Sequence, residues 1–325
     1  MRVLLSSVGR RGYLVKYFKQ ALGAGDEVWG VDSSPYAPGF VYCDRRYILP
    51  EVSNPAYCDK LLSLCKENHI DIVIPLIDPE LNVLTRRQED FAKSNITVVV
   101  SPPATIEMTF NKYLTWQWAQ KNNIAMPLTV LTVEEALDDI RAGRMKWPLV
   151  IKPRKGSASS NILYCYDEIQ LRGAFDGCPE PMIQQFVEGP EYGYDLFADG
   201  QFRPVSVFCK KKLTMRAGET DKAISTNEPA LIDFGKKLLD AMQLFGPADV
   251  DVILSSTGPQ LLEINPRFGG GYPCAHLAGA DFCKKLVDIR LGKTPVCDIG
   301  AGSEGICMLK QDEIIRPDWN NLPKA

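Results

Sequence analysis

Short apolar runs alternate with amphipathic stretches over the first hundred residues of the chain. In the amphipathic stretches, apolar residues return every three or four positions, as they do in a helix that packs on a sheet. This alternation predicts a βαβ arrangement with a parallel sheet covered on both faces. The predicted strands are 3–5, 28–31, 72–76 and 97–100, and the predicted helices are 13–22, 57–67 and 80–93.

The pattern changes after the double proline at Pro102 and Pro103, where strands and helices begin to follow each other less regularly. We therefore expect an α/β fold that becomes α+β in its C-terminal part, divided into residues 1–101, 102–190 and 191–325. A helix should carry Lys112, and others should cover 134–141, start near Asp167 and cover 229–244. The predicted strands are 149–152, 162–164, 182–186, 193–198, 203–208, 248–254 and 260–265.

Composition excludes several classes of protein. The net charge of -3 argues against a general nucleic-acid binder. No apolar stretch approaches the ~18 residues of a membrane helix, and the N-terminal stretch predicts a strand rather than a signal peptide. Ten cysteines without a Cys-x-x-Cys pair favour reduced thiols and a cytoplasmic protein, and two histidines exclude a multi-histidine zinc site.

Residues 261–271, Leu-Leu-Glu-Ile-Asn-Pro-Arg-Phe-Gly-Gly-Gly, combine several unusual choices. Glu263 and Asn265 lie two apart on a predicted strand, so their oxygens share one face, where they suit a hard divalent cation such as Mg²⁺. Arg267 adds a planar fork for phosphate or acyl-phosphate oxygens, and the glycines allow close approach of a ligand. The alternative is a strand end with one surface salt bridge.

A second pair of acids precedes this motif. Asp249 and Asp251 alternate with apolar residues, so both face one side of a strand that would pair with the one bearing Glu263. Either aspartate could complete a cation site, with Asp251 nearer the expected position. A solvated acidic face would produce the same pattern.

Two further segments suit a nucleotide. Lys152 ends a predicted strand, and the Gly/Ser loop after it offers backbone N–H groups and hydroxyls to a polyphosphate, although a surface hairpin with a chance lysine is the alternative. Residues 182–192 then run through a Gly-Pro turn like a hinge. There the backbone of Gln185 and Val187 offers an acceptor and a donor to a purine, and Glu191 suits ribose hydroxyls.

Residues 210–222 predict a long, polar and cationic loop. Loops of this length without structure of their own are often functional, and we expect Arg216 to hold a carboxylate or its acyl phosphate there. A simple solvated loop is the alternative.

In this order, the motifs resemble the ATP-grasp superfamily, most of all one catalytic unit of the carbamoyl-phosphate synthase large subunit, over about residues 1–290. The resemblance implies a pre-ATP-grasp domain followed by two α+β subdomains that clamp ATP, with two Mg²⁺ ions for which Mn²⁺ can substitute. By position it implies ATP contacts at Lys112, Lys152, Lys155, Gly156, Ser157, Ala158, Ser159, Gln185, Phe186, Val187 and Glu191, magnesium ligands at Asp251, Glu263 and Asn265, and a catalytic arginine at Arg267.

The resemblance implies an ATP- and Mg²⁺-dependent ligase. It would activate a small carboxylate such as an amino acid as an acyl phosphate and join it to an amine or a thiol. The alternatives are a carbamoyl-phosphate-synthase-like half-subunit working with a partner chain, and a non-catalytic ATP sensor. The expected partners are small-molecule carboxylates and amines, with neither nucleic acid nor membrane, and a homodimer formed through the N-terminal domain is compatible with this function.

The turn Gly9-Arg10-Arg11-Gly12 after the first strand leaves a further alternative open. With Asp32 at the end of the second strand it is a partial match to a dinucleotide-binding turn, which would make the protein an oxidoreductase, but the first glycine of that motif is missing. In an ATP-grasp protein the same turn would face the active site. Its two arginines could then bind an anionic substrate, and Asp78 and Glu80 at the same sheet edge could meet an amine.

Overall fold

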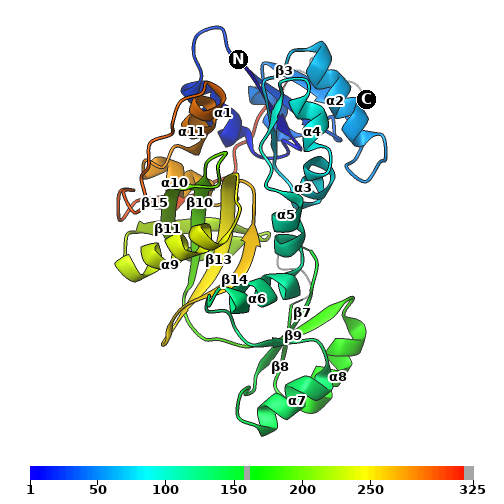
Figure 1. Cartoon of the computed structure of the whole chain (residues 1–325), viewed down its shortest axis with the longest axis vertical. Coiled ribbons are helices and arrows are strands. Elements are labelled where there is room, and N and C mark those ends of the chain that lie inside the picture. The colour runs from blue at the N-terminus through cyan, green and yellow to red at the C-terminus, as the bar shows by residue number, and fades with distance from the viewer. Residues whose placement is uncertain (157–161, 318–325) are drawn as a thin grey trace.

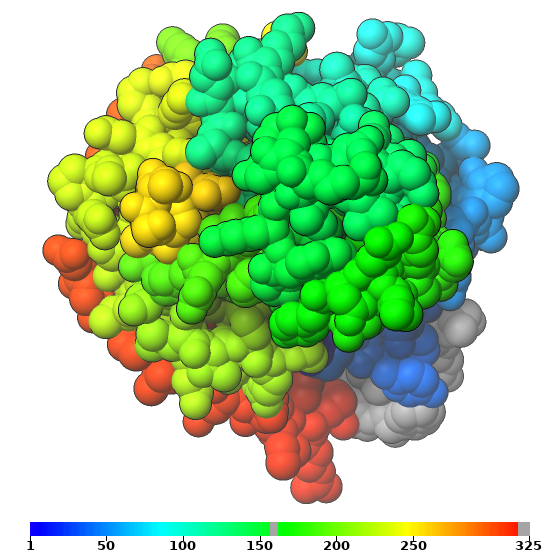
Figure 2. Space-filling view, turned by 90° about the horizontal axis from the view of Figure 1, so that it is seen from below, coloured from blue at the N-terminus to red at the C-terminus, as the bar shows by residue number. Residues whose placement is uncertain are grey.

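The computed structural model describes residues 1–156 and 162–317, which form three sheets along the long axis of the molecule (Figure 1). A parallel five-stranded sheet lies beside an antiparallel six-stranded sheet. A four-stranded antiparallel sheet with two helices projects at the opposite end, and we call this part (129–185) the lid. Seen from that end, the lid lies in front of the other parts (Figure 2). The predicted α/β fold that becomes α+β is confirmed.

The N-terminal sheet has the strand order β3-β2-β1-β4-β5, and its strands are parallel. Residues Val3, Leu4 and Leu5 of the central strand are fully buried, because helices cover both faces. The elements are β1 (Arg2–Ser6), α1 (Gly12–Ala21), β2 (Glu27–Asp32), η1 (Pro38–Tyr42), β3 (Arg45–Ile48), α2 (Tyr57–Glu67), β4 (Ile72–Pro75), α3 (Asp78–Thr85), α4 (Gln88–Ala92) and β5 (Thr97–Val98).

Two details of this sheet differ from the prediction. The expected helix 80–93 is two helices, because the chain breaks at Arg86 and Arg87, and the Arg87 guanidinium pairs with Asp90 of α4 at 2.5 Å. Strand β3 was not predicted, because it is a short edge strand whose residues are exposed or half-buried and lack the apolar run of the inner strands. Two helices, α5 (Pro103–Phe110) and α6 (Lys112–Lys121), then lead to the lid.

The lid sheet has the order β6-β9-β7-β8. Helix α7 starts at a capping box, in which the Thr132 hydroxyl accepts from the Glu135 N–H and the Glu135 carboxylate accepts from the Thr132 N–H. The elements are β6 (Thr129–Val130), α7 (Val133–Arg141), β7 (Leu149–Pro153), β8 (Leu163–Cys165), α8 (Glu168–Gly177) and β9 (Pro181–Gln185).

The C-terminal sheet has the order β14-β13-β10-β11-β12-β15, with helix α9 packed on it. Its two acid-bearing strands, β13 and the edge strand β14, are the ones predicted to pair, and they do. The elements are β10 (Glu191–Ala198), β11 (Pro204–Arg216), β12 (Glu219–Thr226), α9 (Pro229–Ala241), β13 (Gly246–Ser255), β14 (Gly258–Asn265), α10 (Tyr272–Leu277), α11 (Phe282–Arg290) and β15 (Cys307–Leu309).

The prediction of a loop at 210–222 was wrong. These residues form the β11–β12 hairpin, with its turn at Ala217 and Gly218. The charges that suggested solvent are matched inside the protein. The Lys210 side chain is fully buried and its ammonium lies 2.5 Å from the Asp195 carboxylate of β10. A paired charge can be buried where an isolated one cannot, so the cationic run forms a strand.

One hydrophobic core joins the N-terminal and C-terminal sheets. It includes Leu5 and Phe18 from the first part of the chain together with Phe208, Phe268 and Tyr272 from the last. The lid has a separate core of its own. Among the helices of the described residues, none has the length and hydropathy needed to cross a membrane.

Candidate active site

The pairing of β13 with β14 brings the predicted acids together on one face. Asp251 lies directly opposite Glu263, and Asp249 lies directly opposite Asn265. Directly opposed residues on antiparallel strands point to the same side, at Cβ separations of about 5 Å. We call these four residues the acid cluster.

Lysines balance the charge of the acid cluster. The Lys112 ammonium, at the start of α6, lies 3.2 Å from the Glu263 carboxylate and donates to the Gly156 carbonyl at 2.5 Å. The Lys212 ammonium of β11 lies 2.6 Å from the Asp251 carboxylate. Lys152 of β7 is buried nearby. Burial lowers its pKa to about 8, and the opposing attraction of the Glu263 carboxylate, which raises the pKa, is smaller.

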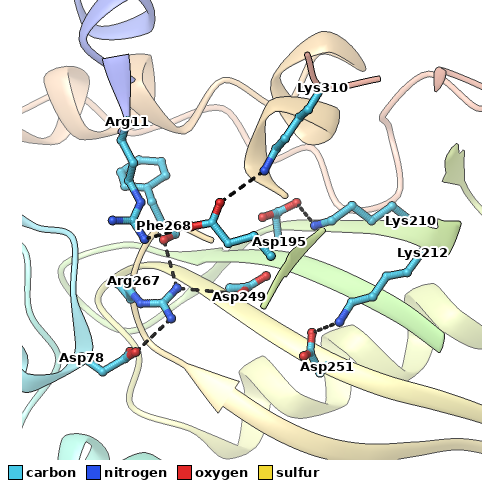
Figure 3. A network of polar contacts seen from close by, with 11 residues as sticks. Arg11, Asp78, Asp195, Lys210, Lys212, Asp249, Asp251, Arg267, Phe268 and Lys310 are labelled. Atoms are coloured by element: carbon cyan, nitrogen blue, oxygen red, sulfur yellow. Dashed lines mark hydrogen bonds and ion pairs between the residues drawn. The ribbon is translucent and has the colours of Figure 1, made fainter. Parts of the chain in front are cut away.

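Gly193 of β10 makes room for this arrangement. A Cβ atom there would lie 3.3 Å from the Cε atoms of both Lys210 and Lys212. The bare backbone therefore lets Lys212 reach from β11 across β10 to Asp251 on β13. Figure 3 shows the two lysines running side by side, Lys210 toward Asp195 and Lys212 toward Asp251.

Arg267 lies where the predicted active site meets the N-terminal sheet. Its Nη2 donates to Asp78 at the start of α3 at 2.9 Å, and its Nη1 lies 3.8 Å from Asp249 (Figure 3). Burial, followed by repulsion from Asp251, raises the pKa of Asp249 to about 6. A Cβ atom at Gly269 would overlap the Asp249 carboxyl group, so the glycine run lets the backbone lie directly on the acid cluster.

The hinge residues line a cavity of about 600 Å³ between the lid and the β13–β14 hairpin. Gln185, Phe186 and Val187 line it together with Ser255 and Thr257 of the β13–β14 hairpin. The Gln185 side chain is held by the backbone of the lid, since its Oε1 accepts from the Lys146 N–H at 2.7 Å. The cavity that it lines is large enough for a purine.

Not every predicted residue lies at the acid cluster. Glu191 is exposed at the start of β10, 3.8 Å from the Lys212 ammonium. Arg216 lies at the end of β11, where its guanidinium binds Asp312 at 2.9 Å and 3.1 Å and Asp221 at 3.1 Å. Lys155 lies on the lid, 3.0 Å from Glu180. Ser157, Ala158 and Ser159 lie outside the described residues.

The sequence reasoning missed the roles of Lys210, Lys212 and Asp195. The two lysines lie two apart, which places them on one face of a strand, and this spacing was a usable signal. It was obscured because the surrounding run of charged and polar residues suggested a loop. Asp195 stands alone in an apolar strand, which suggests a partnered charge but does not name the partner.

Internal hydrogen bonds fix the first βα turn. The Asp32 carboxylate accepts from the backbone N–H groups of Gly9 at 2.8 Å and Ser34 at 3.0 Å, so it fixes the turn. The Gly39 N–H donates to the Gly9 carbonyl at 2.8 Å, and the Tyr42 ring lies against Gly12. Asp32 is thus engaged by the turn itself, and the first glycine of the dinucleotide motif is missing, which argues against the oxidoreductase alternative.

Comparison with known families agrees with this architecture. Residues 109–271 match the ATP-grasp domain family, and residues 3–99 match the PylC-like N-terminal domain. The first match covers half of the chain, and the chain belongs to the ATP-grasp family. The resemblance inferred from the order of the motifs is thereby confirmed.

Individual relatives share part of their length with this chain. The alpha-aminoadipate–LysW ligase LysX of Sulfurisphaera tokodaii is 26% identical over 174 residues, 47% of this chain and 59% of that protein. Dapdiamide A synthase of Enterobacter agglomerans is 25% identical over 198 residues, 51% and 46% respectively. The L-amino acid ligase of Bacillus licheniformis has the same fold, with a TM-score of 0.68 at 19% identity over 89% of this chain and 74% of that one. The chain spans about half the length of the curated relatives it matches.

Proposed function

We propose that this protein is an ATP- and Mg²⁺-dependent ligase that joins the carboxylate of a small molecule, such as an amino acid, to an amine through an acyl phosphate. The observation that carries the proposal is the meeting of Lys112, Lys152 and Arg267 with the acid cluster, from four separate segments of the chain. Relatives whose names describe carboxylate–amine ligation support the same reaction class.

The acid cluster suits a divalent cation. Asp251 and Glu263 are direct cross-strand partners, and Asn265 lies beside Asp249, so carboxylate and amide oxygens share one face. The described residues hold no group of three or more acidic, His or Cys side chains in metal-binding geometry. We propose that Asp251, Glu263 and Asn265 hold Mg²⁺, two ions in all and replaceable by Mn²⁺, which would neutralise phosphate charge.

ATP would lie between the lid and the C-terminal sheet. The cavity at the hinge would take adenine against the backbone of Gln185 and Val187, with Phe186 in the same wall and Glu191 toward the ribose. Lys112 and Lys152 would contact the phosphates, and the segment that starts at Lys155 and Gly156 would close over them. Both lysines are buried, so solvent would screen the attraction between their charges and a phosphate only weakly.

The reaction would proceed in two steps. A carboxylate oxygen attacks the γ-phosphorus, an O–P bond forms, the bond to the β-phosphate oxygen breaks, and ADP leaves. The amine nitrogen then attacks the acyl carbon, a C–N bond forms, the C–O bond breaks, and phosphate and a proton leave. Arg267, fixed by Asp78 and Asp249, would stabilise charge on the moving phosphoryl group, and closure of the lid would exclude water.

The test measures Mg²⁺-dependent release of ADP and phosphate with pools of amino acids, other small carboxylates and bicarbonate. One pool should stimulate release, and Lys112→Met should lower kcat/KM by about a hundredfold. Lys121→Met is the matched control, because Lys121 is exposed at the other end of the same helix. ATP binding without stimulation by any carboxylate would favour a sensor or a required partner chain, and absence of ATP binding would refute the proposal.

A further inference from the structure

A second cavity, of about 570 Å³, opens at the carboxyl ends of the strands of the N-terminal sheet. The loops after β1, β2, β3 and β4 line it, and Glu219 from the β11–β12 hairpin closes it on the side of the C-terminal sheet. The strand order places β1 between β2 and β4, so the cavity lies at the switch point where open α/β sheets bind their ligands. The proposed ATP and magnesium sites do not use it.

The cavity contains the guanidinium group of Arg11. Arg11 lines the wall with its side chain 15% exposed, and Glu219 lies 3.9 Å from its Nη2, beyond hydrogen-bond distance. Its Nε is buried and has no partner within the described structure. Arg10 lies beside it at the exposed end of the same wall. Two adjacent guanidinium groups suit a carboxylate.

The same cavity also contains acids, which decides the charge of its ligand. Asp32, Glu51 and Glu219 line it together with the two arginines. A ligand with two or more negative charges, such as a phosphate ester, would be repelled by these three carboxylates. A molecule that carries one carboxylate and one ammonium group would satisfy both signs.

The floor of the cavity is held by a buried carboxyl group. Glu80 of α3 is fully buried beneath Ser7 and Tyr57, whose hydroxyls both donate to it, Ser7 at 3.2 Å. Burial raises the pKa of Glu80 to about 7. These bonds hold Ser7, which has a φ of 54°, and Tyr57 in place as lining residues, so the cavity is a built feature.

Asp78 separates this cavity from the acid cluster. Its neighbours Ile77 and Pro79 line the cavity, while Asp78 itself faces Glu263 and Asn265 on the other side. Its Oδ2 accepts from Arg267, but its Oδ1 is buried and has no partner in the part of the chain that the structure describes. Asp78 therefore belongs to the wall between the cavity and the acid cluster and not to the lining of the cavity.

We propose that this cavity binds the amine substrate and that this substrate is an amino acid, with its carboxylate on Arg11 and Arg10 and its amino group toward the lining carboxylates Asp32, Glu51 and Glu219. The inference rests on the proposed ligase function and specifies the second substrate of that reaction. The two arginines would then select amines that carry a carboxylate.

The test uses titration calorimetry on the whole chain, with and without a non-hydrolysable ATP analogue and Mg²⁺. The probes are pools of proteinogenic amino acids, then each binding amino acid beside its decarboxylated amine, and inorganic phosphate. An amino acid should bind, its decarboxylated amine should bind at least tenfold more weakly, and Arg11→Met should weaken the amino acid alone to about the same extent. Arg45→Met, an exposed arginine of β3, is the matched control.

A second variant guards against misfolding of Arg11→Met. Ser53 is exposed at the cavity wall, so Ser53→Trp should fill the cavity without disturbing the core and should also weaken amino acid binding. The proposal is overturned if no amino acid binds, if phosphate or the decarboxylated amine binds as tightly, or if both variants bind like the wild type. Carboxylate-dependent ADP release by the wild type, together with no binding of any amino acid, would keep the ligase function and reject this cavity.

Discussion

Raising the pH through about 8 should weaken ATP binding, because the charge of Lys152 is then lost in the free protein. Burial lowers the pKa of this ammonium from the ordinary 10.5 to about 8. In the complex, phosphate oxygens would hold the proton, so the pKa would return toward its ordinary value. The group is charged in both states below pH 8, and only the free state loses its proton as the pH rises through 8.

The magnitude follows from that difference. A change from 10.5 to about 8 corresponds to roughly 3 kcal/mol, at ~1.4 kcal/mol per pKa unit. The apparent Kd of MgATP, measured with a non-hydrolysable analogue, should therefore rise by about tenfold between pH 7 and pH 9. At pH 8, about half a proton should be taken up per nucleotide bound, which calorimetry in buffers of different ionisation enthalpy measures.

Two variants isolate the effect. Lys152→Met should bind the analogue more weakly, with a Kd that no longer depends on pH in this range, and Lys121→Met should keep the wild-type profile. A wild-type Kd that stays constant from pH 7 to pH 9 would refute the reasoning. So would a pH dependence in Lys152→Met equal to that of the wild type.

Two further substitutions test the interior of the sheet. Asp195→Ala leaves the Lys210 ammonium unpaired in a fully buried position, and should lower the free energy of unfolding by about 3–5 kcal/mol in urea titrations. Asp240→Ala, which breaks an exposed pair on α9, should change it by less than ~0.5 kcal/mol, and equal effects would contradict the argument. Gly269→Ala should displace the carboxylate behind it and abolish carboxylate-stimulated ADP release, whereas Gly173→Ala, with open space around it, should keep full activity.

The spacing of residues within a segment predicted the features that depend on that segment alone. Alternation of acid and apolar residues placed Asp249 and Asp251 on one face, and the same spacing placed Glu263 and Asn265, so the register of two strands brought all four together. Order along the chain was enough to predict the family. Neither result required knowledge of a distant contact.

The β11–β12 hairpin could not be predicted in this way. A lysine on a strand is improbable until its partner is known, and Asp195 and Asp251 lie 15 and 39 residues away from Lys210 and Lys212. The space that Gly193 leaves for the lysine side chains also depends on the pairing of β10, β11 and β13 and not on one segment. Tertiary pairing thus overrode the local preference for a solvated loop.

The two large sheets share one hydrophobic core and the lid has another, and this division determines how the molecule unfolds. Because Leu5 and Phe18 share one core with Phe268 and Tyr272, neither large sheet can open without exposing the apolar surface of the other. The two therefore form a single cooperative unit of unfolding. The lid, with its own core, is a second unit that can melt while the acid cluster and the cavity at the N-terminal sheet keep their shape. Loss of nucleotide binding on mild heating would then precede loss of the fold.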